Sequence, residues 1–181
     1  SLSIVGDSFA KPMLHALDAE PGKYDLSSVM LVTSSGVMWS VEVKRGLLKH
    51  MPRVILTDAF SSSEAIGMGT SIMTAAGEQP TAKFSIGERC KVIDENDQPI
   101  PPGSNTPGMV ALAPPNPVGY YKDPEKTART FRVIDGVRYS IPGDFCLVGA
   151  DGTLTLLGRG NACINTAGEK VFPEEVEEAL K

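Results

Sequence analysis

The sequence from Tyr139 to Leu180 decides how the chain is organised, and it reads YSIPGDFCLVGADGTLTLLGRGNACINTAGEKVFPEEVEEAL. Two short apolar runs, Phe145–Gly149 and Thr153–Leu157, flank an Ala-Asp-Gly segment whose Asp-Gly pair favours a tight hairpin turn. A Gly-Arg-Gly corner follows, then a second extended pair, and then an acidic helix that begins at Pro173. Polar residues anchored beside strands and glycine turns favour the binding of a small polar ligand.

Four short motifs in this stretch carry a resemblance to a known family. They are Gly143-Asp144, Gly158-Arg159, Gly168-Glu169-Lys170 and Glu175-Val176-Glu177. In this order they resemble the adenylate-forming family, which contains acyl-CoA synthetases, luciferases and peptide-synthetase adenylation domains. The resemblance implies that Asp144 binds the ribose of ATP and that the corner at Arg159 joins a large domain to a small one.

The resemblance assigns roles to four residues in and after this array. Two ribose hydroxyls can donate to one carboxylate, which is the physical reason for an acid at Asp144. Arg159 would contact ribose or phosphate oxygens, because a guanidinium can hold two oxygens at once. Asn161 would be the hinge residue, although the family usually has Asp or Lys there. Lys170 would reach a phosphate or the substrate carboxylate, and the alternative is a solvated lysine on a strand.

Composition and charge exclude several classes of function. The chain has 181 residues, of which 41% are hydrophobic, so it can form a core. Seventeen basic against 22 acidic residues give a net charge of −5 without a basic block, so nucleic acid and anionic membranes are not expected as main partners. No apolar run reaches the roughly 18 residues of a membrane span and no signal peptide opens the chain, so we expect a cytoplasmic protein.

The cysteines and histidines do not predict a metal site. Cys90, Cys146 and Cys163 lack Cys-x-x-Cys spacing, and His15 and His50 are far from any of them. A zinc site is therefore not expected. The simpler interpretation is that the cysteines are small core or half-buried residues in a reducing cytoplasm.

The first 77 residues are typical of part of an α/β layer. Apolar runs predict strands at Leu2–Val5, Ser28–Thr33 and Val54–Thr57. The second run does not alternate, which indicates a parallel strand covered on both faces. Apolar spacing predicts a short helix at Pro12–Leu17 and a longer one at Val41–His50. Strand, helix and strand at this spacing form a crossover unit.

From about residue 78 the pattern changes to short apolar runs, and most of the fourteen prolines follow. Hairpins are predicted around residues 94–97 and 135–136, with a strand at Met109–Leu112 between them. A helix is predicted from Pro124 to about Thr130, because the preceding Asp accepts free N–H groups and proline fits the first turn.

The predicted fold class is α/β, in three parts. Residues 1–77 would be the last part of the α/β layer of a large nucleotide-binding domain. Residues 78–157 would form an antiparallel, barrel-like β subdomain. Residues 158–181 would contain the hinge and the start of a small α+β domain.

The loop after the third predicted strand, LTDAFSSSEAIGMG from Leu56 to Gly69, is a candidate phosphate site. Three serine hydroxyls and the Glu64 carboxylate suit a magnesium-bound phosphate at the mouth of the sheet. The alternative is a capped turn in which Glu64 stabilises a helix N-terminus. The loop resembles the Tyr-Gly-Ser/Thr-Thr-Glu motif of the adenylate-forming family, with Ser61 in place of Gly. This implies Phe60 as the aromatic residue, Ser63 as the phosphate contact and Glu64 as the magnesium ligand.

A second turn, after the predicted strand Ser28–Thr33, would shape the adenine and acyl sites. In the family, a small-residue turn here lets adenine and the acyl chain approach the backbone; Ser35 replaces the first glycine of that turn and Gly36 keeps the second. The apolar side chains that follow would line the acyl pocket, and the alternative for the tryptophan is core packing. They are Val37, Met38 and Trp39.

The resemblance implies a fragment of an ATP-dependent fatty-acyl-CoA synthetase. In such enzymes the carboxylate attacks the α-phosphate of ATP to give acyl-AMP and pyrophosphate, and the CoA thiol then displaces AMP. ATP, Mg²⁺ and CoA are the implied cofactors and co-substrates. Residues 33–44 and 56–69 look most like actinobacterial synthetases for long-chain or sterol side-chain acids. The alternatives are an enzyme that loads a carrier protein and a segment that only binds.

Two further observations concern turnover. The block Gly6-Asp7-Ser8 is compatible with an esterase, but the sequence has neither a downstream Asp-x-x-His nor a Gly-x-Ser-x-Gly motif. The family's upstream phosphate loop and its C-terminal catalytic lysine are not among the 181 residues. We therefore expect the chain alone to be inactive, with exposed sheet edges that favour self-association.

Overall fold

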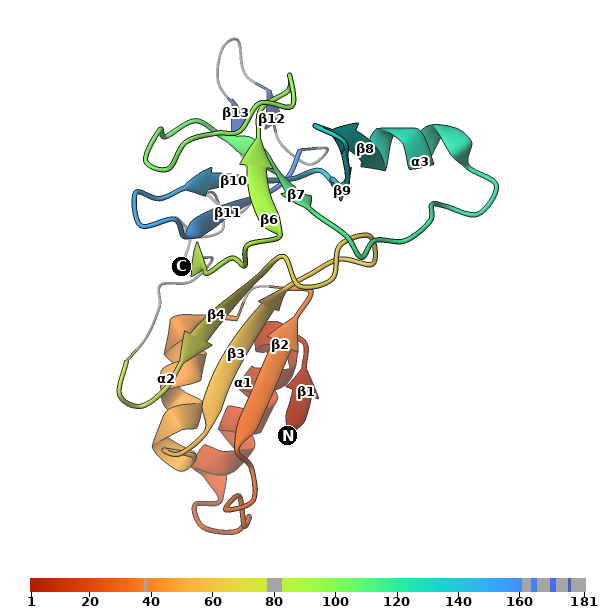
Figure 1. Cartoon of the computed structure of the whole chain (residues 1–181). Helices are drawn as coiled ribbons and strands as arrows, with labels where there is room; N and C mark the ends of the chain where they lie inside the picture. The colour runs from red at the N-terminus through yellow and green to blue at the C-terminus, as the bar shows by residue number, and fades with distance from the viewer. Residues whose placement is uncertain (38, 78–82, 161–163, 166–169, 172–175, 177–181) are drawn as a thin grey trace. The chain divides into compact units, whose positions relative to one another are not determined.

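The computed structural model describes residues 1–181 except 38, 78–82, 161–163, 166–169, 172–175 and 177–181 (Figure 1). The described residues form two compact units, and each is described by itself. The first unit contains Ser1–Ser61 and Thr70–Lys83, and the second contains Ser62–Gly69 and the chain from Phe84 onward. The predicted division into parts at residues 78 and 158 stays a prediction.

The first unit is a four-stranded sheet with two helices. The sheet has the order β1-β2-β3-β4, and β1, β2 and β3 run parallel, with Val32 between Leu2 and Leu56 (Figure 1). This confirms the predicted crossover units. The elements are β1 Leu2–Ile4, α1 Gly6–Ala19, β2 Leu31–Ser35, α2 Val41–His50, β3 Ile55–Phe60 and β4 Gly69–Met73.

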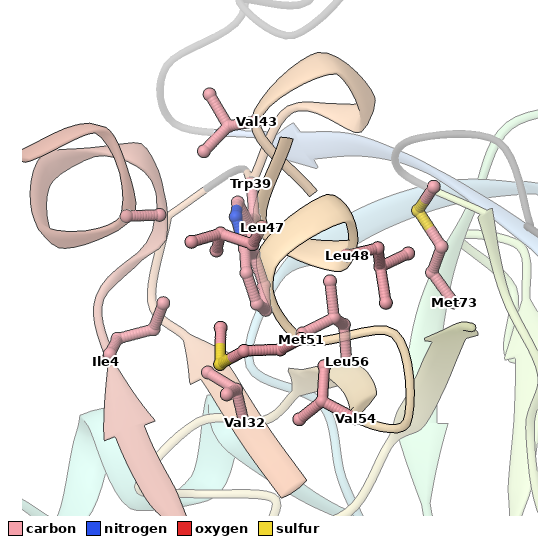
Figure 2. Close-up of a cluster of buried hydrophobic side chains, with 11 residues drawn as sticks. Ile4, Val32, Trp39, Val43, Leu47, Leu48, Met51, Val54, Leu56 and Met73 are labelled. Atoms are coloured by element: carbon pink, nitrogen blue, oxygen red, sulfur yellow. The ribbon is translucent and has the colours of Figure 1, made fainter. Parts of the chain in front are cut away.

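The core of the first unit lies between one face of this sheet and the two helices (Figure 2). Helix α2 buries the side of Val43 and Leu47, as its apolar spacing predicts, and α1 buries Ala10. Burying each large aliphatic side chain contributes roughly 2 kcal/mol. The larger core side chains are Ile4, Val32, Trp39, Val43, Leu47, Leu48, Met51, Val54, Leu56 and Met73.

Three predictions for this unit were wrong. Helix α1 is more than twice as long as predicted and contains Pro12, because burial along its apolar side outweighs the proline penalty of about 3 kcal/mol. Strand β4 was missed, since its sequence GTSIM contains one glycine and two hydroxyl residues and its pairing with β3 is non-local. Strand β2 is covered on one face only, because Leu31 and Ile55 on the other face are 36% and 44% exposed.

The second unit contains a seven-stranded sheet. The strands follow the order β5-β11-β10-β7-β9-β8, and β6 pairs with β7. Among the described strands this path is open, so the predicted barrel-like layer is a sheet and not a closed barrel. The elements are β5 Lys83–Phe84, β6 Cys90–Ile93, β7 Gly108–Leu112, α3 Pro124–Thr130, β8 Phe131–Ile134, β9 Val137–Ser140, β10 Asp144–Val148, β11 Leu154–Arg159, β12 Ile164–Asn165 and β13 Lys170–Val171.

Local sequence signals placed several of these elements correctly. Asp123 caps α3 by accepting a hydrogen bond from the backbone N–H of Lys126 at 2.9 Å. The β8–β9 hairpin turns at Asp135 and Gly136, which both have positive φ, as a two-residue hairpin requires. The β10–β11 hairpin is also confirmed.

The described residues also bear on the excluded classes of function. Cys90 and Cys146 are free and buried, and burial raises their thiol pKa to about 11 and about 12. They are core residues, as the sequence indicated. None of the helices in the described part of the chain is long and apolar enough to cross a membrane.

Candidate functional site

Three predicted site residues, Glu64, Asp144 and Arg159, act on one another electrostatically in the second unit. The Nε atom of Arg159 donates to Oδ1 of Asp144 at 3.2 Å. The charge of Arg159 lowers the pKa of both carboxyl groups, and the charge of Glu64 raises the pKa of Asp144. The second unit therefore brings together an acid predicted for ribose, an acid predicted for magnesium and a cation predicted for phosphate or ribose.

The paired strands β10 and β11 build the Asp144–Arg159 part of this site. Asp144 is the first residue of β10 and lies opposite Arg159, the last residue of β11. Gly143 has φ +91°, a left-handed conformation that glycine adopts readily, and its carbonyl accepts a hydrogen bond from Gly160 at 3.1 Å. A Cβ at Gly160 would lie 2.5 Å from the ring of Phe145. Glycine is therefore favoured at both positions, at Gly143 by the backbone conformation and at Gly160 by the lack of space for a side chain.

Asp144 is a buried acid with spare capacity to accept hydrogen bonds. The residue is 7% exposed, and its Oδ2 atom has no hydrogen-bond partner among the described residues. Burial raises the pKa of this carboxyl group, and Arg159 opposes the rise. A buried oxygen without a donor costs free energy, so a ligand hydroxyl placed here would gain a hydrogen bond.

The Glu64 carboxylate is held by a residue that the sequence did not reveal. The hydroxyl of Tyr120 donates to Oε1 of Glu64 at 2.6 Å. This hydrogen bond is the main reason why the pKa of Glu64 is lowered, so the carboxylate is ionised at neutral pH. The hydroxyl of Ser140 donates to the backbone carbonyl of Glu64, also at 2.6 Å. No local pattern predicts either contact, because the partners are 56 and 76 residues from Glu64.

The loop around Glu64 is a hydrogen-bonded turn. The N–H of Ala65 donates to the carbonyl and to the hydroxyl of Ser62, at 3.2 and 3.1 Å. Ser63 is exposed beside Glu64. Residues 63–68 form bends and turns and not a helix, so Glu64 does not stabilise a helix N-terminus here. The acid and the neighbouring hydroxyl are available for a ligand.

The first unit holds the residues predicted for adenine and the acyl chain. Ser35 and Phe60 end the neighbouring strands β2 and β3, and Gly36 follows with φ +91°. Val37 is 52% exposed, whereas Trp39 is 1% exposed and packs in the core (Figure 2). The core position is the alternative that the sequence left open for the tryptophan.

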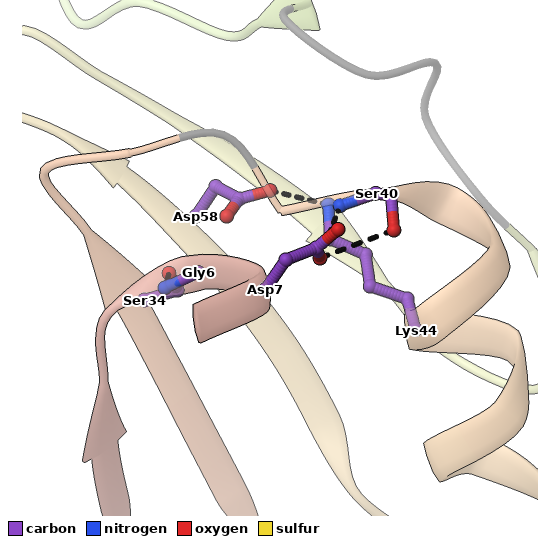
Figure 3. Close-up of polar contacts among 6 residues, drawn as sticks. All are labelled: Gly6, Asp7, Ser34, Ser40, Lys44 and Asp58. Carbon is purple, nitrogen blue, oxygen red and sulfur yellow. Dashed lines mark hydrogen bonds and ion pairs between the residues drawn. The ribbon is translucent and has the colours of Figure 1, made fainter. Parts of the chain in front are cut away.

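The block Gly6-Asp7 lies at the carboxyl ends of these strands and has a structural role (Figure 3). The N–H of Gly6 donates to the Ser34 hydroxyl at 2.8 Å. Oδ1 of Asp7 accepts hydrogen bonds from the N–H and the hydroxyl of Ser40, at 2.9 and 3.1 Å, where α2 begins. The block therefore joins the end of β1 to β2 and to the start of α2.

Next to this network lies a buried ion pair between Lys44 of α2 and Asp58 of β3 (Figure 3). The side chain of Lys44 is 2% exposed, and its ammonium group lies 5.4 Å from the ring centre of Trp39. Burial raises the pKa of Asp58, and the hydrogen bond and charge of Lys44 oppose the rise. The pair fastens α2 to the strand that leads into the Glu64 loop.

Three predicted residues cannot be placed. Met38 and Asn161 lie outside the described residues. Lys170 begins strand β13, and only its backbone is described. Their roles in the acyl pocket, the hinge and phosphate contact stay predictions.

Comparisons with known proteins identify relatives of the chain. No family model matches it. It is 47% identical over 182 residues to a medium/long-chain fatty-acid and 3-oxocholest-4-en-26-oate CoA ligase of Mycobacterium marinum. It is 48% identical over 186 residues to a 3-oxocholest-4-en-26-oate CoA ligase of Rhodococcus rhodochrous. The matches cover 99% and 98% of the chain but 33% of each ligase, so the chain spans about a third of the length of these curated relatives.

A solved structure supports the fold assignment. The anthranilate CoA ligase AuaEII in complex with anthranoyl-AMP superimposes with a TM-score of 0.77 at 22% identity. The match covers 98% of this chain and 33% of that one. The chain is thus similar in sequence to about a third of two fatty-acid and sterol-acid CoA ligases, and it shares the fold of the corresponding third of AuaEII.

Proposed function

We propose that this chain supplies the ribose-binding and magnesium-binding part of an ATP-dependent acyl-CoA ligase. The observation that carries the proposal is the buried Asp144 carboxylate, which has one unpartnered oxygen and lies in the same electrostatic cluster as Arg159 and the ionised Glu64. The 47% identity to a CoA ligase supports a nucleotide, and not another polar ligand, as the molecule that this cluster binds.

The nucleotide would be held through its ribose and its phosphates. Oδ2 of Asp144 would accept a hydrogen bond from a ribose hydroxyl, which satisfies the buried oxygen. The guanidinium of Arg159 is 54% exposed and keeps donors for ribose or phosphate oxygens, because only Nε is given to Asp144. Ser35, Gly36 and Phe60 would border the adenine at the ends of β2 and β3.

Glu64 would be the protein ligand of Mg²⁺. Within the described residues no group of three or more His, Cys, Asp or Glu side chains could hold a metal by itself. This agrees with magnesium chemistry, because Mg²⁺ is usually bound by one or two carboxylates together with substrate phosphates and water. The ionised carboxylate of Glu64 and the neighbouring Ser63 hydroxyl fit such a site. Bound Mg²⁺ would neutralise the charge that develops on the phosphates.

The reaction needs mostly positioning and charge neutralisation from these residues. The carboxylate of the substrate would attack the α-phosphate of ATP to give acyl-AMP and pyrophosphate, and CoA thiol would then displace AMP. Asp144 and Arg159 fix the ribose end, which limits movement of the α-phosphate. Val37 and Met38 would border the acyl chain. Asn161 would serve as the hinge and Lys170 as a further phosphate or carboxylate contact.

The acid is a fatty or sterol-derived carboxylic acid and the acceptor is CoA, since the named relatives act on acids of these kinds. We place the enzyme in the cytoplasm. The acceptor is tested by offering the full-length enzyme either CoA or a carrier protein. Acyl-CoA formation supports the proposal, and transfer to the carrier protein alone contradicts it.

The nucleotide site is tested by measuring AMP binding to the chain by calorimetry. We expect Asp144→Ala to weaken binding by about 10-fold or more, because a charge-assisted hydrogen bond contributes about 1.5–3 kcal/mol. The control is Asp25→Asn, which changes an exposed acid that forms hydrogen bonds with the N–H and the side chain of Ser27. Equal affinities of all three proteins would contradict the proposal. The chain alone is expected to give no ATP–pyrophosphate exchange.

A further inference from the structure

Tyr120 contacts Glu64 from the segment before α3, which contributes no other residue to the proposed site. Its hydroxyl donates to Oε1 of Glu64 at 2.6 Å. The hydroxyl of Ser140 fixes the backbone carbonyl of the same residue at 2.6 Å. Glu64 is therefore held both at its main chain and at its carboxylate. Of the hydrogen bonds to the carboxylate, the one from Tyr120 lowers its pKa most, and one with Ser62 adds to it.

The environment of Tyr120 restricts where its phenol can lie. The N–H of Tyr120 donates to the Thr127 hydroxyl of α3 at 2.9 Å. A Cβ at Gly119 would lie 2.6 Å from the Thr127 side chain, so glycine is required for this close approach. The ring lies 6.0 Å from the ring of Phe131, and the ammonium group of Lys126 lies 4.0 Å from its centre. Main chain and ring are thus both held by α3 and its continuation.

The phenol suits the orientation of a carboxylate that must bind a metal. A hydrogen bond to an ionised acceptor is stronger than a neutral one, and it favours the charged form that Mg²⁺ requires. Each carboxylate oxygen has two lone pairs, so the bond to Tyr120 leaves Glu64 able to coordinate a cation. Groups in this position typically change metal affinity or activity by 10–100-fold when they are removed.

We propose that Tyr120 is a positioning residue, which orients the Glu64 carboxylate toward the magnesium-bound phosphates of ATP. The inference rests on the proposed function of Glu64 as the magnesium ligand. The proposal gives the loop before α3 a role, because this loop contains Tyr120. Tyr120 acts through Glu64 and does not touch the reacting atoms.

The first test measures the contact itself in the chain. Burial and the Glu64 carboxylate raise the pKa of the Tyr120 phenol. Ultraviolet titration of the chain and of Tyr120→Phe gives the ionisation of this tyrosine by difference. Glu64→Gln should lower that pKa, and Glu95→Gln, which changes an exposed acid, should leave it unchanged. An unchanged pKa in Glu64→Gln would overturn the contact.

The second test measures the magnesium dependence of acyl-CoA formation in the full-length enzyme that contains this sequence. Tyr120→Phe removes one hydroxyl and should raise the Mg²⁺ concentration for half-maximal rate by about 10-fold. Tyr121→Phe is the matched control, because the adjacent tyrosine is 87% exposed, and it should behave as the unchanged enzyme. Saturating Mg²⁺ should restore most of the rate, which a merely structural role would not predict.

The two hypotheses fail in different ways. If Glu64→Gln raises the magnesium requirement and Tyr120→Phe does not, the positioning role is wrong and the proposed magnesium ligand stands. If Glu64→Gln itself leaves the magnesium dependence unchanged, the proposed function of Glu64 is wrong. Circular dichroism of each variant separates both results from a loss of folding.

Discussion

A strand aspartate pairs with a cation in each unit, Asp58 with Lys44 and Asp144 with Arg159, and the two cations differ in how far they are exposed. In the first unit, Lys44 is 2% exposed and pairs with Asp58. In the second unit, Arg159 is 54% exposed, and its Nε donates to Oδ1 of Asp144. Burial raises the pKa of both aspartates, but only Asp144 keeps a buried oxygen without a partner among the described residues.

The difference separates a pair that holds the fold from a pair that can bind. A buried cation that pairs with an acid of the same protein has no exposed donors left for a ligand. Removing either partner leaves the other charge without its counter-ion. An exposed cation beside a half-satisfied acid keeps donors and acceptors for a ligand, at a cost in stability. Charge and residue type alone do not distinguish the two pairs.

The largest expected effect is on the enclosed pair. Lys44→Met should lower the free energy of unfolding by about 3 kcal/mol, because it leaves the Asp58 carboxylate buried without its cation. Urea denaturation measures the change, and Lys49→Met on the exposed side of α2 is the control. The double variant Lys44→Met/Asp58→Asn should recover part of the loss. A loss below about 0.5 kcal/mol in the single variant would mean that the pair does not hold α2 to β3.

A smaller effect is expected at the cap of α2. Asp7→Ala removes the acceptor of two hydrogen bonds from Ser40 and should lower stability by about 1 kcal/mol. Asp7→Asn keeps an acceptor and should lose less. The free energies of unfolding of the two variants, compared with that of Asp25→Ala, check this. Equal losses of unfolding free energy in Asp7→Ala and Asp25→Ala would show that the hydrogen bonds from Ser40 to Asp7 do not stabilise the chain.

Asp144, with its unpartnered oxygen, should behave in the opposite way. Asp144→Asn should raise the stability of the chain by about 1 kcal/mol at neutral pH while it weakens AMP binding. The folded-state pKa of Asp144 is raised, so the stability associated with its proton is present below the unfolded pKa of 3.8 and is lost as pH rises through the folded pKa.

The advantage of Asp144→Asn should therefore grow as the pH rises from about 4 through the folded pKa, as measured by urea denaturation at each pH. The control is Asp25→Asn, whose stability relative to the unchanged chain should show no such growth. A variant that is less stable than the unchanged chain at neutral pH would show that the charge of Asp144 stabilises the fold, as that of Asp58 is expected to do.

The smallest effect on stability is expected for Arg159→Ala. An exposed ion pair contributes about 0–1 kcal/mol, so we expect a loss below about 0.5 kcal/mol. AMP binding should nevertheless fall, because the exposed donors are removed. Calorimetry and urea denaturation on the same preparation check both expectations, with Arg53→Ala as the control for an exposed arginine of the first unit. A large loss of stability without weaker AMP binding would show that Arg159 stabilises the fold and does not bind the nucleotide.

Elements with strong local signals were predicted well from the sequence. Helix α2 has its predicted bounds, and α3 begins after the predicted Asp cap. The hairpins at residues 135–136 and 150–152 were also predicted, because Asp-Gly pairs adopt the positive φ that such turns require. Strand β4 and the length of α1 could not be predicted, since both depend on packing against distant segments.

The sequence by itself determined the chemical types at the site. An acid and an arginine at the ends of a hairpin, and an acid after a serine-rich loop, are recognisable from residue order and turn chemistry. The motif resemblance also pointed to the family, and the comparisons confirm the relationship.

Only the tertiary structure decided which charges are enclosed and which are open. The sequence left both a pocket and a core position open for Trp39, and no local pattern predicts that Lys44 is buried or that Tyr120 binds Glu64. Burial and hydrogen bonding of these side chains depend on segments brought together by folding, some of them more than 50 residues apart in sequence, as the 56 residues between Tyr120 and Glu64 illustrate. Local propensity acts over a few residues, so it cannot encode such contacts.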